Sequence, residues 1–120
     1  IFKFRFGGSG HSFDRIKNSK GNEFNTSHTQ GSISLTLDKF SDETRLYPDY
    51  VKIDVDGNEL RIINGMKNLL ASKKIKSILI ELDRTFSEHI EAISILNSFD
   101  YKLSFYKDNN GVSNHIFNLN

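Results

Sequence analysis

The chain has 120 residues, enough for one domain with a modest core, and its hydrophobic fraction of 37% predicts that it folds. Sixteen basic and 15 acidic residues leave a net charge of +1, which gives no reason to expect a nucleic-acid or membrane-surface partner. The absence of cysteine excludes disulfides, thiolate metal sites and cysteine nucleophiles. No apolar run approaches the roughly 18–20 residues of a membrane span. This composition fits a cytoplasmic protein.

The first segment, residues 1–6, alternates apolar and basic residues, so that Phe2, Phe4 and Phe6 share one face of a predicted strand. Because the chain begins with Ile1 rather than Met, and already as a strand, we interpret it as a fragment or a processed chain. In an incomplete sheet the three Phe side chains would be exposed at a strand edge and could promote self-association.

A polar segment follows, from Gly7 to Gly31, rich in Gly, Ser and Asn and without clear periodicity. We predict a long loop, of the kind that is usually a functional lid or mobile. His11 and His28 lie in it and could approach a site as a base, although solvated loop histidines are the commoner case.

Alternation returns in Ser32–Phe40, where Ile33, Leu35 and Leu37 would share one face of a strand. After a polar connection, Tyr50–Val55 is short and rich in β-branched residues, which predicts a buried strand.

Helical spacing of apolar residues then appears in Gly57–Ala71 and again in Ser87–Phe99. Between them, Lys76–Leu82 has a continuous apolar centre, as expected for a strand covered on both faces. Tyr101–Lys107 alternates, DNNG predicts a turn, and Asn114–Leu119 would close a hairpin. This order predicts a single α/β domain in which parallel strands with right-handed crossovers are followed by an antiparallel hairpin at the sheet edge.

The stretch VKIDVDGNEL places Asp54 and Asp56 one residue apart and just before Gly57. It resembles part of an EF-hand loop, D-x-[DN]-x-[DN]-G with a final Glu. Aligned on Gly57, however, the loop would begin with Lys52, where an anion is needed, and end with Ile63, which cannot bind calcium. A preceding helix is also missing, so the pattern argues against a calcium site.

The same carboxylates suit a site at the end of a sheet, because ligands of open α/β sheets lie outside the carboxyl ends of the parallel strands. Asp54 and Asp56 stand at such an end, and Glu81 falls at the same level of the next predicted parallel strand. Such carboxylates can orient a cofactor amine, hold a metal or act as a base. Structural roles stay open: Asp56 can cap the next helix, Asp54 can pair with Lys52, and Glu59 can complete a capping box.

Other polar side chains give weaker signals. The four histidines lack metal-ligand spacing, and His89 and His115, at the starts of a predicted helix and strand, are expected at the surface. Ser9 and Ser12 lack the context of a nucleophile elbow, so no hydrolase triad is predicted.

The stretch VKIDVDGNELRIINGMKNLL resembles the most recognisable motif of the FkbM family of S-adenosylmethionine-dependent methyltransferases. That motif is a strand and helix start, (I/V)-K-(I/L)-D-(V/I)-E-G-x-E, followed by an apolar helix with a glycine near its middle. The matching residues are Lys52, Asp54, Gly57, Glu59 and Gly65. Asp56 replaces the usual Glu. The family's strand ending in Glu resembles SILIELD with Glu81, and its upstream strand ending in Leu-Asp resembles SLTLDKF with Asp38, so the resemblance covers nearly the whole chain.

This resemblance implies a fold and a function. The fold would be the C-terminal half of a Rossmann-like class I methyltransferase sheet, with a long loop at about 7–31. The function would be methyl transfer from S-adenosylmethionine to a hydroxyl of a sugar, lipid or polyketide-like acceptor. Asp54 would face the reaction centre, supported by Asp56 and Glu81, and Asp54 and Gly57 would contact the cofactor.

One part of the class I pattern is missing from the sequence. Such enzymes bind the cofactor mainly through a Gly-rich turn after the first strand and an acidic residue after the second. Gly7–Gly10 is not that turn, because no helix start follows it. We therefore expect the isolated chain to bind the cofactor weakly and to be inactive alone. The alternative is a non-catalytic α/β module that uses the same half-sheet for binding or assembly.

Overall fold

The computed structural model describes residues 2–6, 11–14, 28–30, 34–55, 57–109 and 112–120. The chain divides into two compact units, one of residues 1–34 with 55–58, the other of residues 35–54 with 59–120. Within the described residues, no helix is long and apolar enough to cross a membrane. The prediction of a single domain stays a prediction.

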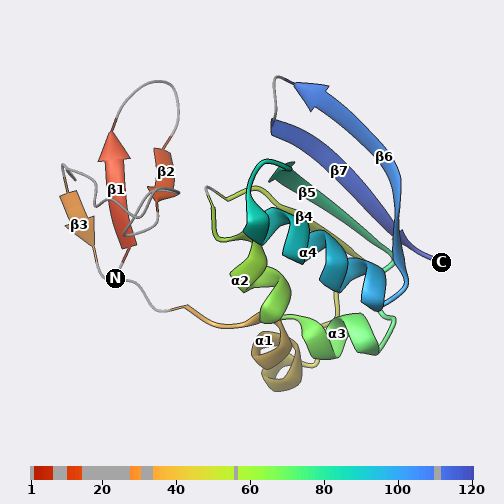
Figure 1. The fold of residues 1–120 in the computed structure, drawn as a ribbon. Helices are drawn as coiled ribbons and strands as arrows, with labels where there is room; N and C mark the ends of the chain where they lie inside the picture. The colour runs from red at the N-terminus through yellow and green to blue at the C-terminus, as the bar shows by residue number, and fades with distance from the viewer. Residues whose placement is uncertain (1, 7–10, 15–27, 31–33, 56, 110–111) are drawn as a thin grey trace. The chain divides into compact units, whose positions relative to one another are not determined.

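The first unit contains a three-stranded antiparallel sheet with the strand order β2-β1-β3 (Figure 1). Strand β1 spans Phe2–Phe6, as predicted, and pairs with β2 (His11–Asp14) and β3 (His28–Gln30). The prediction of one loop from 7 to 31 was therefore wrong, because two of these strands lie within it. Their polar residues show no period-2 apolar pattern, and it is the backbone of β1 that pairs with them. The side chains of Phe2, Phe4 and Phe6 lie outside the described part, so the predicted self-association stays a prediction.

The second unit is built on a four-stranded mixed sheet with the order β4-β5-β7-β6 (Figure 1). Its strands are β4 (Tyr50–Ile53), β5 (Ser77–Asp83), β6 (Tyr101–Asn109) and β7 (Val112–Leu119). Strands β4 and β5 are parallel, whereas β7 is antiparallel to both β5 and β6. The α/β class with a parallel pair and a closing hairpin is confirmed. The hairpin is not simply added at the edge, however, because its second strand inserts between β5 and β6.

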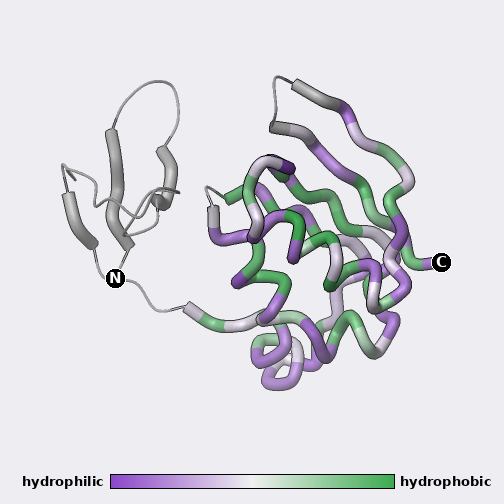
Figure 2. Tube along the Cα trace, viewed as in Figure 1, coloured by the Kyte–Doolittle hydropathy of each residue, from purple (hydrophilic) through white to green (hydrophobic). Residues whose placement is uncertain are grey.

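Four helices belong to this unit: α1 (Leu37–Thr44), α2 (Glu59–Asn64), α3 (Lys67–Ala71) and α4 (Ser87–Ser98). Figure 1 shows α2, α3 and α4 on one face of the sheet. Hydrophobic residues recur along these helices and along β5 (Figure 2). The fully buried core side chains come from both layers: Ile63, Met66, Leu70, Ile75, Ile78, Ile80, Leu82, Leu96, Tyr101 and Phe117. Burial of this apolar surface stabilises the unit.

Burial along β5 alternates from residue to residue. Ile78, Ile80 and Leu82 are buried beneath the helices, whereas Leu79 and Glu81 on the opposite face are only half-buried. The expectation that this strand is covered on both faces was therefore wrong for the described part of the chain. A continuous apolar run does not distinguish a strand buried on two faces from one buried on a single face.

Helix α1 replaces the strand predicted for Ser32–Phe40. The hydroxyl of Thr36 accepts a hydrogen bond from the backbone N–H of Lys39 at 3.2 Å and thereby caps the helix. Asp38 lies in the first turn, where a negative charge is favourable. The alternating Leu residues misled the prediction, because the capping pattern at Thr36 decides the local structure. Ile33 lies outside the described residues.

The predicted helix of Gly57–Ala71 is divided into α2 and α3 at Gly65 and Met66. Asp38 reaches across from α1, and its two carboxylate oxygens accept the N–H groups of Asn68 and Leu69, each at 3.0 Å. The N–H of Asp38 donates to the carbonyl of Gly65 at 3.0 Å. Asp38 thus caps α3, which has no cap from its own N-terminal residue. Two residues that match the family's sequence pattern, Asp38 and Gly65, therefore have a shared structural role.

Gly65 allows α1 to approach α2 closely, and we predict that Gly65→Ala destabilises the fold. An added Cβ would lie 3.2 Å from both Cβ and Cγ2 of Thr36, whose rotamer is held by its capping hydrogen bond. We expect the free energy of unfolding to fall by about 1 kcal/mol in urea denaturation.

Thr36→Ser is the matched background for this test, since serine keeps the capping hydroxyl and removes Cγ2. Gly65→Ala should lower the free energy of unfolding by less in this background, because the effects of substitutions at residues in contact are not additive. An equal cost in both backgrounds would show that the close approach to Thr36 is not the cause.

Candidate functional site

The carboxyl ends of β4 and β5 bring two of the predicted site residues together. In the parallel register Lys52 is level with Leu79 and Ile53 with Ile80, so the next residues, Asp54 and Glu81, are level with each other. Both lie on the sheet face opposite α2, α3 and α4, since Ile53 and Ile80 point into the core. Asp54 is exposed and Glu81 half-buried. Asp56 lies outside the described residues.

Lys52 shares this face with the two carboxylates. Its ammonium lies 2.8 Å from Oδ2 of Asp54, and both side chains are more than half exposed. The hydrogen bond and the charge of Asp54, with a smaller contribution from Glu81, raise the pKa of Lys52 above its usual 10.5. Lys52 is therefore a cation that orients Asp54, and the pairing weighed as a structural role of Asp54 is present.

A buried pair lies on the other side of the same strand ends. Nε2 of His89, in the first turn of α4, is 3.0 Å from Oε2 of Glu59, the first residue of α2. Glu59 is 2% exposed and His89 6% exposed. The backbone N–H of Asp83, the last residue of β5, donates to Nδ1 of His89 at 2.7 Å. The carbonyl oxygen of Asp83 also lies 3.0 Å from Nδ1. Because a carboxylate only accepts hydrogen bonds, the proton between Nε2 and Glu59 is donated by the imidazole ring.

The prediction that His89 lies at the surface was wrong. Two parallel strands end at the same edge of the sheet, so the helices that follow them also begin there. Glu59 and His89 each lie in the first turn of such a helix and are therefore brought into contact. That topological relation was the signal available in the sequence. The edge of the Phe86 ring also packs against His89, with ring centroids 5.4 Å apart. The pair joins α2, α4 and the end of β5, and so holds the two strand ends that carry Asp54 and Glu81.

We predict that Glu59→Ala lowers the free energy of unfolding by about 3 kcal/mol, because it leaves a buried imidazole N–H without its acceptor. Glu59→Gln keeps an acceptor oxygen and should cost about 1 kcal/mol. Urea denaturation of both variants measures the difference.

Glu43→Ala is the control, since Glu43 forms only an exposed pair with Lys39 at 3.8 Å. It should leave the free energy of unfolding unchanged. Equal losses for Glu59→Ala and Glu43→Ala would contradict a structural role of the buried pair.

His115 is the second histidine that the sequence placed wrongly at the surface, since it is fully buried in β7. Its Nδ1–H donates to the carbonyl of Ser113 at 2.9 Å, and its Nε2 accepts the Nε–H of Arg84 at 3.0 Å. Burial lowers the pKa of His115, the hydrogen bond to Ser113 acts in the opposite direction, and the charges of Arg84 and His89 lower it further. His115 is therefore held as a neutral acceptor.

The lowered pKa of His115 predicts a pH-dependent stability. In the unfolded chain the imidazole binds a proton near its usual pKa of 6.5, whereas in the folded protein it binds one only at lower pH. Below pH 6.5 the unfolded state therefore binds more protons than the folded state. The contribution of His115 to the free energy of unfolding is fully present above pH 6.5 and is lost progressively as the pH falls below it.

NMR titration of the His115 ring protons measures its pKa directly, and His115→Asn should flatten the dependence of stability on pH below 6.5. Titration of the His115 ring at or above 6.5 in the folded protein would contradict this assignment.

The parallel β4–β5 pair with acidic side chains at its carboxyl ends is an arrangement in which α/β proteins bind ligands. Residues 4–103 match the family model of the FkbM methyltransferase domain, which is most of the chain. The chain therefore belongs to the FkbM methyltransferase family. No match was found among curated proteins or among solved structures. In the described part of the chain, no group of three or more His, Asp and Glu side chains could hold a metal ion.

Proposed function

We propose that the protein is an S-adenosylmethionine-dependent O-methyltransferase that acts on a hydroxyl of a sugar, lipid or polyketide-like acceptor. We further propose that the sheet β4-β5-β7-β6 is the C-terminal half of a Rossmann-like class I methyltransferase sheet. The observation that carries the proposal is the placement of Asp54 and Glu81 at the carboxyl ends of two neighbouring parallel strands, in a chain of the FkbM family.

The residues of this face fit part of the cofactor. The ammonium and ribose hydroxyls of S-adenosylmethionine are hydrogen-bond donors, and Asp54 offers an exposed carboxylate that Lys52 holds through Oδ2. Gly57 follows two residues after Val55 with a φ of 85°, which a side chain would disfavour, and its N–H donates to the Val55 carbonyl at 2.8 Å. We propose Asp54 and Gly57 as cofactor contacts. The expected Gly-rich turn is not found in the sequence, so the 120-residue chain alone should bind the cofactor weakly.

When bound, S-adenosylmethionine supplies the methyl group from its sulfonium centre. The acceptor hydroxyl has to lose its proton as it is methylated, and a carboxylate within hydrogen-bond reach can accept that proton. Asp54 is the proposed residue for this role, because it is exposed and oriented by Lys52. Glu81 and Asp56 are proposed to support it by adding negative charge beside the reacting group. The half-buried position of Glu81 suits such a role better than direct contact with a large acceptor.

We predict that Asp54→Asn in the natural protein lowers methyl transfer by at least about 100-fold, the usual contribution of a general base. Because the side chain is exposed, the free energy of unfolding should change little. Methyl transfer is measured with labelled S-adenosylmethionine, and calorimetry with the same compound separates a loss of binding from a loss of chemistry.

Asp49→Asn is the matched control. Asp49 forms an exposed pair with Lys76 at 2.8 Å just before β4, so this change breaks an equivalent ion pair at the other end of the strand. Its activity should equal that of the unchanged protein. Unchanged turnover in Asp54→Asn, or an equal loss in Asp49→Asn, would remove Asp54 from the site and favour the non-catalytic α/β module.

A further inference from the structure

A second cluster of side chains, formed by Arg84, Tyr106 and His115, lies just beyond the carboxyl end of β5 and has no part in the function proposed above. We propose that Arg84, held in place by His115 and Tyr106, binds an anionic group of the methyl acceptor, a carboxylate or a phosphate. The identity of the bound molecule rests on the proposed methyl transfer, whereas the anion site itself does not.

Arg84 follows directly after the last residue of β5, and two contacts fix its long side chain. Its Nε–H donates to Nε2 of His115 at 3.0 Å. Its guanidinium carbon lies 4.9 Å from the centroid of the Tyr106 ring, a distance at which cation and ring attract each other. An arginine that is already oriented loses less conformational entropy when it binds a ligand.

His115 can orient Arg84 only in its neutral form. Its Nδ1–H is donated to the Ser113 carbonyl at 2.9 Å, which leaves the Nε2 lone pair for Arg84. The imidazole is buried and stacks on Tyr106, with centroids 5.8 Å apart and planes at 19°, and on Phe117, with centroids 6.3 Å apart and planes at 18°. This stack keeps water from the imidazole and holds the acceptor atom in one position.

The guanidinium keeps binding capacity after these contacts. It carries five N–H groups, of which the one on Nε is donated to His115. Among the residues that the structure describes, no carboxylate forms an ion pair with Arg84, whereas Lys52, Lys73 and Lys76 are each paired with an aspartate. A planar fork of N–H donors matches the paired oxygens of a carboxylate or a phosphate.

The nearest acidic side chain in sequence is already engaged elsewhere. Oδ1 of Asp83 accepts hydrogen bonds from the backbone N–H of Thr85 at 2.9 Å and from its hydroxyl at 2.6 Å. These bonds lower the pKa of Asp83, so that its side chain stays ionised and bound to Thr85 in the turn after β5. Asp83 therefore does not neutralise the guanidinium by a direct contact.

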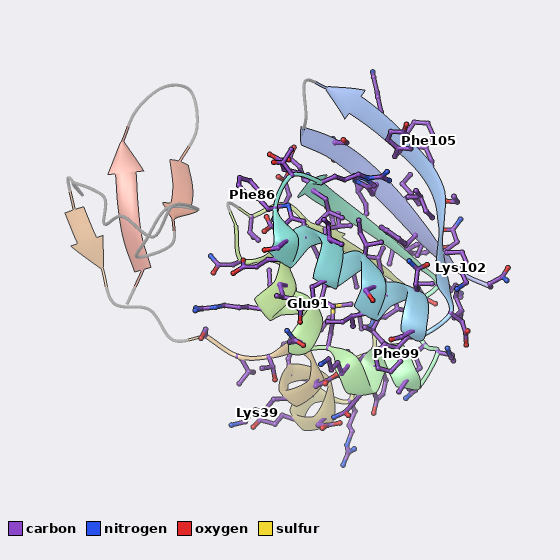
Figure 3. The ribbon with its side chains drawn as sticks, viewed as in Figure 1. Lys39, Phe86, Glu91, Phe99, Lys102 and Phe105 are labelled. Carbon is purple, nitrogen blue, oxygen red and sulfur yellow. The ribbon has the colours of Figure 1, made fainter. Side chains whose placement is uncertain are left out.

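The position of Arg84 links it to the acceptor. Arg84 comes three residues after Glu81, at the end of the sheet where ligands of α/β proteins bind. Two aromatic side chains flank this end of β5: Tyr106, 52% exposed, and Phe86, 39% exposed, which Figure 3 shows where α4 begins. An acceptor with an apolar body and an anionic group would find complementary surface here.

The test follows anion binding by NMR, with inorganic phosphate and with acetate as separate probes at constant ionic strength. The reporters are the ring protons of His115 and the backbone amide of Arg84. We expect saturable shifts at both reporters with at least one probe, and the stronger probe distinguishes a phosphate from a carboxylate site. Arg84→Gln should abolish saturation at the amide of residue 84, and Arg84→Lys, which keeps the charge but loses the fork, should weaken binding about tenfold.

Lys107→Gln is the charge-matched control. Lys107 is exposed and follows Tyr106 in β6, so its side chain points to the opposite face of the sheet. This variant should bind the anion as the unchanged protein does. The absence of saturation with both probes, or an equal loss in Lys107→Gln and Arg84→Gln, would overturn the proposal.

A kinetic measurement connects the site to the acceptor. Arg84→Gln should raise the KM for an anionic acceptor at least tenfold more than it raises the KM for the same acceptor with its anionic group converted to a neutral methyl ester. The affinity for S-adenosylmethionine should be unchanged. Saturable phosphate binding in a protein without methyl transfer would refute the proposed function and leave the anion site standing. Normal methyl transfer with no effect of Arg84→Gln on the KM would refute the acceptor role of Arg84.

Discussion

The buried hydrogen bond between His89 and Glu59, with the Asp83 backbone at the other ring nitrogen, is the constraint on which the candidate site depends. It connects the helix that follows β4 to the helix that follows β5, at the end of the sheet where both strands stop. A buried polar pair of this kind is costly unless its partners stay in place, so it favours one spacing of the two strand ends. The parallel register, which pairs Lys52 with Leu79 and Ile53 with Ile80, then places Asp54 level with Glu81 on the opposite face.

Alternation of side chains then divides this end of the sheet into two chemically different sides. The open face carries Asp54, Glu81 and a lysine, whereas the helix-covered face carries a neutral imidazole at His115 and the arginine that it orients. Consecutive residues of a strand point to opposite faces, so the same short strand ends supply the carboxylates of the open face and the buried groups of the helix-covered face. Acidic groups suited to accepting a proton and a cation suited to holding an anion thus lie at one end of the sheet but on its two sides, so Arg84 does not form an ion pair with these carboxylates.

Several elements could be predicted because their pattern is local. Strands β4 and β5 are short apolar runs and helix α4 has helical spacing of its apolar residues, and the structure has all three within a residue or two of the predicted ends. The failures have a common cause in long-range contacts. Strands β2 and β3 exist through pairing with β1, and the division between α2 and α3 depends on Asp38, a residue far away in the sequence. Single-sequence periodicity carries no information about such partners.

The amino-acid pattern alone specified the α/β class, the acidic strand ends and the family resemblance, because all three are encoded in consecutive residues. Tertiary structure decided which side chains are buried. His89 and His115 look like surface residues at element starts, and only the packing of neighbouring strands and helices encloses them and supplies the partners that make burial favourable. It also decided that β7 lies between β5 and β6, since the pairing of strands is set by packing across the sheet and not by the order of the chain.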